Sequence, residues 1–166
     1  MPGYAGLLAC IWGKYFVQIK YVLKLKDAAR ANGHGVYSVA PTVSIRGAAE
    51  ILAKNKVGIL IVEDDRNKLI DVLSERDVVR ALGTGEEKNL DANVEAFITR
   101  DVKTCRGEHL FIDAMELMSS GGFRHMPVVT GEKCADMLSS RDLAHYITSY
   151  ASPEEQAALW TKISWV

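Results

Sequence analysis

Two serine–aspartate pairs carry the residue types best suited to ligand chemistry in this chain. They lie in Ser74-Glu75-Arg76-Asp77 and in Ser139-Ser140-Arg141-Asp142, and each follows a short apolar stretch. A serine with an acid three residues later is the pattern of a capping box, in which each side chain bonds a backbone amide of the other at the start of a helix. The simplest interpretation of the pattern is therefore structural.

The arginine that precedes the acid in both copies, Arg76 or Arg141, is not explained by a helix cap. Unpaired amides, a hydroxyl and a guanidinium at the start of a helix together favour phosphate binding. An aspartate one turn into the helix could accept hydrogen bonds from both hydroxyls of a ribose. The capping and ligand-binding interpretations are compatible, because a helix start can be capped without ligand and occupied with it.

The elements that position these residues form an internal repeat with an offset of 66 residues. Residues 35–39 match residues 101–105, and both copies continue with apolar residues at helical spacing, namely Ile45, Ala48, Ala49 and Leu52, then Phe111, Ala114, Met115 and Met118. Two short strands follow in each copy, predicted at 57–62 and 69–73, then at 126–129 and 134–138. The turn between the strands is predicted to be one residue shorter in the second copy. A short helix closes each copy.

The repeating unit is thus strand, helix, strand, strand, helix, which predicts an α/β (α+β) fold. One unit of about 60 residues has too little core to stand alone, so we expect two βαββα repeats packed sheet to sheet. The predicted domains are an N-terminal amphipathic helix over 1–26, the repeats over 27–90 and 91–150, and a helical tail over 151–166.

The two ends of the chain are predicted to add helices. Residues 1–26 hold four lysines, no acid and a helical stripe of apolar residues that ends at Leu23. This stripe could pack on the domain or on a second subunit, dock on a membrane surface, or belong to a processed or misassigned start. Lys14 interrupts the apolar run, so a membrane-spanning helix is not expected. Pro153 is predicted to open the C-terminal helix, whose tryptophans we expect to pack on a partner or on the N-terminal helix.

Composition excludes several functional classes. The formal net charge is −1 over 166 residues, so the chain as a whole has no basic footprint for nucleic acid. Three cysteines, odd in number and far apart, indicate reduced thiols and a cytoplasmic location. The histidines show no metal-ligand spacing with the cysteines, and no nucleophile motif or Walker loop occurs. We therefore expect neither a metal site nor an enzyme.

The duplicated layout closely resembles a pair of cystathionine β-synthase-type (CBS) domains, the tandem regulatory unit also called a Bateman module. The matching stretches are residues 69–82, 98–102 and 123–129, and the resemblance covers about residues 25–150. It implies two α/β repeats related by a pseudo-twofold axis, with two clefts between their sheets. It also implies an adenosine-containing regulatory ligand (AMP, ADP, ATP, NAD(H) or S-adenosylmethionine) and a disc-shaped homodimer.

The resemblance assigns roles to individual residues. Asp77 and Asp142 would hold ribose hydroxyls, and Ser74 and Ser139 would lie close to phosphate. The segment that usually lines the base corresponds to Thr99, Arg100, Asp101 and Val102, and the strand that flanks the same cleft corresponds to Arg124, His125, Met126 and Pro127. Their first-repeat counterparts Val36 and Tyr37 could contact adenine or pack in the core.

The chain departs from the family pattern at Asp71 and Asp136, where family members usually carry glycine. Each lies three residues before the serine, so strand alternation predicts that it points to the opposite face from the ligand. Further departures fall in the first repeat, so the second-repeat cleft is predicted to be the better nucleotide site.

These patterns lead to one functional expectation and one alternative. We expect a non-catalytic module that senses an adenosine nucleotide, such as AMP, ATP or NADH, and signals energy or metabolite status to a regulated protein that the sequence does not identify. The alternative is a protein-interaction or dimerisation module whose clefts stay empty.

Overall fold

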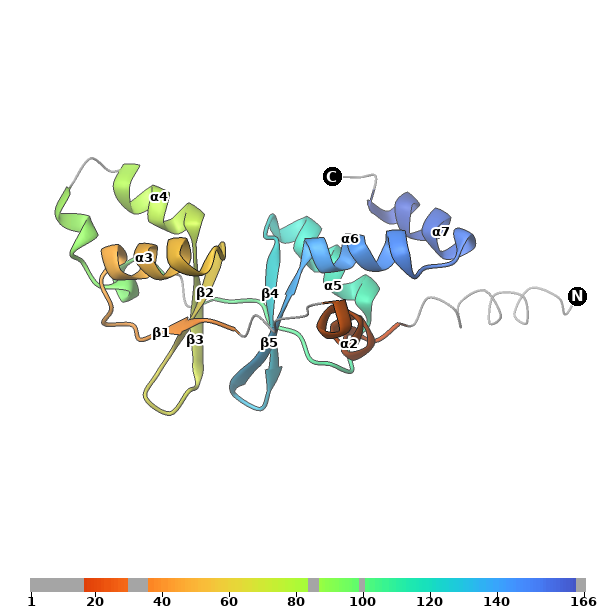
Figure 1. The fold of residues 1–166 in the computed structure, drawn as a ribbon, viewed down its shortest axis with the longest axis horizontal. Coiled ribbons are helices and arrows are strands. Elements are labelled where there is room, and N and C mark those ends of the chain that lie inside the picture. The colour runs from red at the N-terminus through yellow and green to blue at the C-terminus, as the bar shows by residue number, and fades with distance from the viewer. Residues whose placement is uncertain (1–16, 30–35, 84–86, 99–100, 164–166) are drawn as a thin grey trace, which may run out of the picture. The chain divides into compact units, whose positions relative to one another are not determined.

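The computed structural model describes residues 17–29, 36–83, 87–98 and 101–163 (Figure 1). These form two compact units, each of which is described by itself. The first-repeat unit comprises residues 35–104 and 129–136, and the second-repeat unit comprises residues 1–34, 105–128 and 137–166. The predictions made for residues 1–16, for Thr99 and Arg100 and for the tryptophan side chains lie outside the described residues.

The first-repeat unit is a three-stranded sheet covered by two helices (Figure 1). Its elements are β1 (Ser38–Val39), α3 (Ile45–Asn55), β2 (Ile59–Glu63), β3 (Leu69–Ser74), α4 (Glu75–Gly83) and the 3-10 turns η1 (Glu87–Leu90) and η2 (Val94–Ala96). β2 lies in the centre, parallel to β1 and antiparallel to β3. Apolar residues from both helices and all three strands form its core.

The second-repeat unit has the same plan with extra helices. Its elements are α2 (Ile19–Ala29), α5 (Phe111–Gly121), β4 (His125–Thr130), β5 (Lys133–Ser139), α6 (Ser140–Ser149) and α7 (Pro153–Ile163). β4 pairs with β5, and the first strand of this copy is reduced to a parallel bridge between Cys105 and Val128. The turn of the β4–β5 hairpin belongs to the first-repeat unit, where the amide of Leu69 donates to the carbonyl of Glu132 at 2.9 Å.

The predicted βαββα order and the offset of 66 are confirmed. Val39 pairs with Val62 in the first copy, and Cys105 pairs with Val128 in the second, so both partners are shifted by 66 positions. The antiparallel register of the first copy shifts after Val62, because Val62 faces Asp71 whereas Glu63 faces Leu69. Ile70 falls between these pairs, so the extra residue that the sequence assigned to a longer first turn is accommodated in a bulge.

The helices at the two ends pack on the second-repeat unit. Ile19, Val22 and Leu23 of α2 are buried in its core together with Leu159 of α7. In the described residues, the apolar stripe therefore packs on its own chain, and α2 extends past the predicted end at residue 26 to Ala29. α7 begins at Pro153 as predicted. Among the described residues, every helix is too short or too polar to cross a lipid bilayer.

Candidate functional site

Both serine–aspartate pairs form the predicted capping box. In the first copy, the amide and hydroxyl of Ser74 donate to Asp77 Oδ2 at 2.8 and 2.6 Å, and the amide of Asp77 donates to Ser74 Oγ at 3.4 Å. In the second copy, the same three distances for Ser139 and Asp142 are 2.9, 2.7 and 3.2 Å. Each strand thus runs directly into a capped helix start, which fixes the aspartate one turn inside the helix.

The two aspartates differ in the cation beside them. Asp77 Oδ1 accepts from Arg80 Nη1 at 3.3 Å, and Arg80 lies on the same helix with 69% of its side chain exposed. Asp142 Oδ2 lies 3.5 Å from Lys26 Nζ of α2, and only 6% of the lysine side chain and 11% of the aspartate side chain are exposed. The second copy therefore has a buried ion pair where the first has an exposed contact within one helix.

Lys26 reaches Asp142 because of its place on α2. It follows Ile19, Val22 and Leu23 on the buried stripe of the helix, at a position where an apolar residue would be expected. Its ammonium also donates to the backbone carbonyl of Met137 on β5. Burial of a charge is costly unless it is paired and hydrogen-bonded, and these contacts from β5 and α6 meet that requirement.

A cavity of about 380 Å³ lies between α2 and α6 beside this ion pair. Its lining comes from three residues of α2, four of α6 and the residue that caps the end of α6, namely Val22, Leu25, Lys26, Arg141, Asp142, His145, Tyr146 and Tyr150. The cavity thus combines one acidic side chain, one lysine, one arginine and aromatic rings. Groups of these kinds can accept hydrogen bonds from hydroxyls, attract an anion and stack against a planar ring.

The aromatic side of the cavity is held together by ring contacts along α6. Tyr146 packs on Phe111 with ring centres 5.0 Å apart, and Tyr150 stacks on Tyr146 at 6.5 Å. The His145 ring meets Tyr150 edge-on at 5.7 Å and contacts Ser149 Oγ at 3.2 Å. Burial, with a smaller contribution from the charge of Glu155, raises the pKa of Tyr146 above its usual value.

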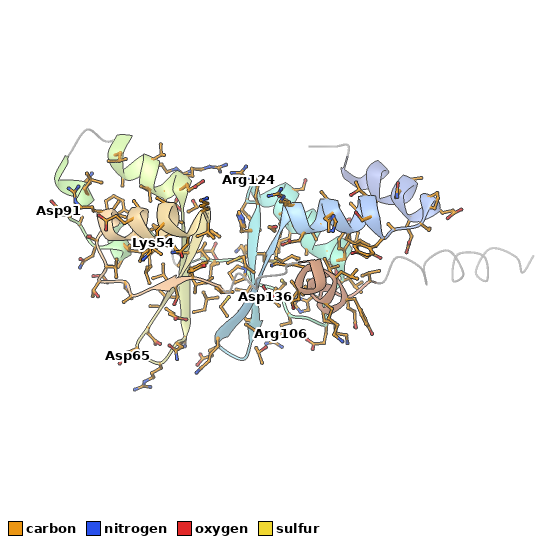
Figure 2. The ribbon with its side chains drawn as sticks, viewed as in Figure 1. Lys54, Asp65, Asp91, Arg106, Arg124 and Asp136 are labelled. Carbon is orange, nitrogen blue, oxygen red and sulfur yellow. The ribbon has the colours of Figure 1, made fainter. Side chains whose placement is uncertain are left out.

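The predicted arginines lie at the surface. Arg76 and Arg141 are exposed, and Arg141 lines the cavity. Arg124 precedes β4 and lies next to the first turn of α6, where its carbonyl accepts from the amide of Ser140 at 2.9 Å (Figure 2). His125, the first residue of β4, is half-buried. The backbone of Arg124 and the side chain of Arg141 thus lie near the capped start of α6.

Met126 and Pro127, predicted to flank the cleft, are buried residues of β4. Both side chains are fully buried, and the carbonyl of Pro127 accepts from the amide of Cys105 at 2.9 Å. Val128 is buried as well, so three consecutive residues of the strand are buried. Of these, Met126 and Val128 belong to the core of the second-repeat unit.

The predicted base-lining residues that the structure describes lie in the first-repeat unit. Asp101 is exposed and pairs with Lys103 at 2.9 Å, and Val102 is half-buried. Val36 and Tyr37 are half-buried, and Tyr37 packs against the core of this unit. For Tyr37, the core-packing interpretation agrees with these contacts.

The two aspartates that replace glycine lie within strands, as their spacing requires. Asp71 is 3% exposed and shares the buried face of β3 with Leu73, whereas Ser74 has the opposite parity. Its Oδ1 accepts from the amide of Val72 at 2.8 Å. Asp136 is half-buried on β5 (Figure 2). The alternation in β3 agrees with the predicted orientation of Asp71 away from the side of Ser74.

Sequence reasoning missed the contribution of α2 and of the later turns of α6. Lys26, His145, Tyr146 and Tyr150 line the cavity with Asp142, but none of them was a predicted site residue. The sequence could have indicated a role for Lys26, because this lysine occupies a position on the apolar stripe of a helix. No group of three or more metal-ligating side chains occurs in the part of the chain that the structure describes.

Comparison with known proteins places this geometry in a family. The CBS domain model matches residues 33–84 and 94–149. The chain is 36% identical over 110 residues to the uncharacterized 17.7 kDa protein in the bps2 3′ region of Acidianus ambivalens, a match that covers 66% of this chain and 65% of that protein. A second curated relative, from Methanocaldococcus jannaschii, is 30% identical over 40% of its length. The chain thus spans less than two thirds of these relatives.

Solved structures share both the fold and part of the sequence. The CBS-domain containing protein ATU1752 from Agrobacterium tumefaciens is 31% identical, with a TM-score of 0.68 and coverage of 76% of this chain and 96% of that one. CBSX2, whose structure was solved in complex with AMP, is 26% identical, with a TM-score of 0.59 and coverage of 76% and 90%. Since the two matched repeats span more than half of the sequence, this chain belongs to the CBS-domain family.

Proposed function

We propose that this chain is a non-catalytic regulatory module that binds an adenosine-containing ligand, with Asp142 as the residue that holds the ribose. The observation that carries the proposal is the position of Asp142. Its carboxylate is fixed by a helix cap, is nearly buried, and borders a cavity that also presents Lys26, Arg141 and two tyrosine rings. In this proposal the carboxylate accepts the hydroxyls of the sugar while the cations attract its phosphate.

Two further observations support this assignment. The same cap is built around Asp77 in the first-repeat unit, so a second ribose acceptor is available. In addition, CBSX2 is similar in sequence and fold and was crystallised with AMP. We infer that AMP, ADP, ATP, NAD(H) and S-adenosylmethionine are the ligands to test, and that occupancy is signalled to another protein.

Calorimetric titration tests the proposal directly. AMP, ATP, NADH and S-adenosylmethionine are titrated into the full chain, and at least one is expected to bind with micromolar affinity, which corresponds to about 8 kcal/mol. Asp142→Asn keeps an oxygen for the cap but removes the charge, so it should weaken binding by roughly tenfold to a hundredfold. Asp113→Asn, which removes an exposed acid from α5 of the same unit, is the matched control and should bind as the parent does.

The absence of binding to all four ligands would contradict the proposal and favour the interaction module. One surface feature is specific to that second candidate. Val79 and Leu82 lie one turn apart on α4 with 64% and 47% of their surfaces exposed, and adjacent exposed apolar side chains mark interaction surfaces. We propose that a second copy of this chain covers them in a homodimer.

Analytical ultracentrifugation measures the oligomeric state that this implies. The parent chain should sediment as a dimer, and the double variant Val79→Ser, Leu82→Ser should sediment as a monomer because the apolar contact is lost. Lys54→Ser, at an exposed position of the neighbouring helix α3 (Figure 2), should leave the dimer intact. A parent chain that is monomeric at all concentrations would refute the homodimer.

A further inference from the structure

Lys26 is a buried cation at a position that packing alone does not require to be charged. It continues the apolar stripe of α2, and its side chain is 6% exposed. An apolar side chain would be the usual occupant of such a position on the buried stripe of a helix. Lys26 instead places a charge at the wall of the cavity that it lines, where that charge is close enough to act on a bound ligand.

The charges around the cavity are unequal. Lys26 and Arg141 contribute two cations, and Asp142 contributes the one carboxylate among the lining residues. The carboxylate is also already engaged, because its Oδ2 accepts from the amide and the hydroxyl of Ser139. A ligand whose ribose is bound by Asp142 would therefore have two cationic side chains, Lys26 and Arg141, among the residues that line the rest of its site.

We infer that Lys26 makes this site selective for adenosine ligands with an anionic 5′ group and against those with a cationic one. The inference rests on the proposed function, because it assumes that Asp142 holds the ribose. The expected ligands are thus nucleotides with a 5′ phosphate, and S-adenosylmethionine, which carries a positive sulfonium at the same carbon, is the disfavoured one.

The distances are short enough for one charge to matter. A ribose hydroxyl bound to Asp142 would lie about 2.7 Å from the carboxylate, and Lys26 Nζ is 3.5 Å from Asp142 Oδ2. The 5′ carbon is only a few bonds from the 3′ hydroxyl, so a ligand whose 5′ group turns toward α2 would bring the 5′ charge within the screening length of about 8 Å of the ammonium at physiological salt. In a partly buried site, one charge at this range changes affinity on the order of tenfold.

Three ligands that share adenosine but differ in charge test the inference. Adenosine, AMP and S-adenosylmethionine are titrated into the full chain, and the affinity is expected to fall in the order AMP, adenosine, S-adenosylmethionine. Lys26→Met should lower the ratio of AMP affinity to S-adenosylmethionine affinity by about tenfold or more. The ratio is the informative quantity, because a change in how Asp142 holds the ribose affects the three ligands alike.

Two variants serve as matched controls. Lys24→Met removes the same charge from the same helix at an exposed position that does not line the cavity, and it should leave the ratio unchanged. Lys26→Arg keeps the charge and should keep the preference for AMP. Circular dichroism of each variant checks that α2 and its unit remain folded.

The outcomes separate this inference from the proposed function. If none of the three ligands binds the parent chain, the proposed function is wrong and the selectivity falls with it. If they bind but S-adenosylmethionine binds the parent at least as tightly as AMP, the inference is wrong and the proposed function stands, even if Lys26→Met fails to fold. If the ratio of AMP affinity to S-adenosylmethionine affinity is the same in the parent and in Lys26→Met, the inference is also wrong, and the proposed function is unaffected.

Discussion

Lys26 Nζ lies 3.5 Å from Asp142 Oδ2. The counter-ion of Asp142, which lies in the first turn of α6, thus comes from α2, a helix that precedes both repeats. The equivalent aspartate of the first repeat, Asp77, instead pairs with the exposed Arg80 of its own helix. Two copies of one motif therefore differ in electrostatic environment, and this difference gives rise to measurable asymmetries.

The first expected asymmetry is in stability. Asp77→Ala should lower the free energy of unfolding by about 1 kcal/mol, because it removes the hydrogen bonds of one cap. Asp142→Ala should lower it by about 3–5 kcal/mol, because it also deprives the buried Lys26 of its counter-ion. Urea denaturation followed by circular dichroism measures both values. Equal losses in the two variants would show that the buried pair has no special role in stability.

Removal of the other partner should cost less. In Lys26→Met, Asp142 keeps its two hydrogen bonds from Ser139 and the favourable N-terminal end of α6. The methionine in turn continues the apolar stripe of α2. The free energy of unfolding should therefore fall by about 1–3 kcal/mol, which is less than in Asp142→Ala, because Asp142 keeps hydrogen-bond partners whereas a buried Lys26 without Asp142 loses its counter-ion. A loss as large as that of Asp142→Ala would contradict this expectation.

A second structural asymmetry concerns the ends of α3 and α5, which are equivalent at the offset of 66. Lys56 ends α3 with a φ of 54°, and Gly122 ends α5 with a φ of 65°. Glycine adopts this left-handed conformation at no steric cost, whereas lysine does not. Lys56→Gly should therefore stabilise the protein by up to about 1 kcal/mol, and Gly122→Ala should destabilise it by about as much. Thermal denaturation of both variants tests the opposite signs.

The half-buried Tyr146 of the cavity predicts a loss of stability at high pH. Burial, aided by the charge of Glu155, raises the pKa of Tyr146 above the usual value of 10.0. The folded state thus holds this proton more tightly than the unfolded state, so the contribution is present in full below pH 10.0 and is lost as pH rises through the folded-state pKa.

Denaturation measured across this alkaline range tests the effect. Tyr146→Phe removes the phenol, so its unfolding free energy should fall less steeply above the usual tyrosine pKa than that of the parent chain. Tyr21→Phe, at an exposed position of α2, is the control and should follow the parent. A pH dependence that is identical in Tyr146→Phe and the parent would exclude the effect.

Patterns in the sequence were enough to predict the duplication, the order of the elements and the two caps. These features depend on spacing between residues close in the chain: apolar residues at helical intervals predicted α3 and α5, and the serine–aspartate spacing predicted the starts of α4 and α6. The left-handed backbone conformation of Lys56 at the end of α3 could not be predicted, because lysine has no preference for that conformation. The bulge at Ile70 was not signalled either, because register depends on the partner strand.

The groups that surround Asp142 depend on tertiary packing. Lys26 reaches the carbonyl of Met137 across 111 positions of sequence, and the cavity joins residues of α2 and α6 that no local pattern connects. Likewise, the burial of three consecutive residues of β4 depends on packing that local spacing does not predict. Local spacing sets helix starts and strand faces, but the counter-ion of a buried charge is chosen by the chain segments that folding brings together.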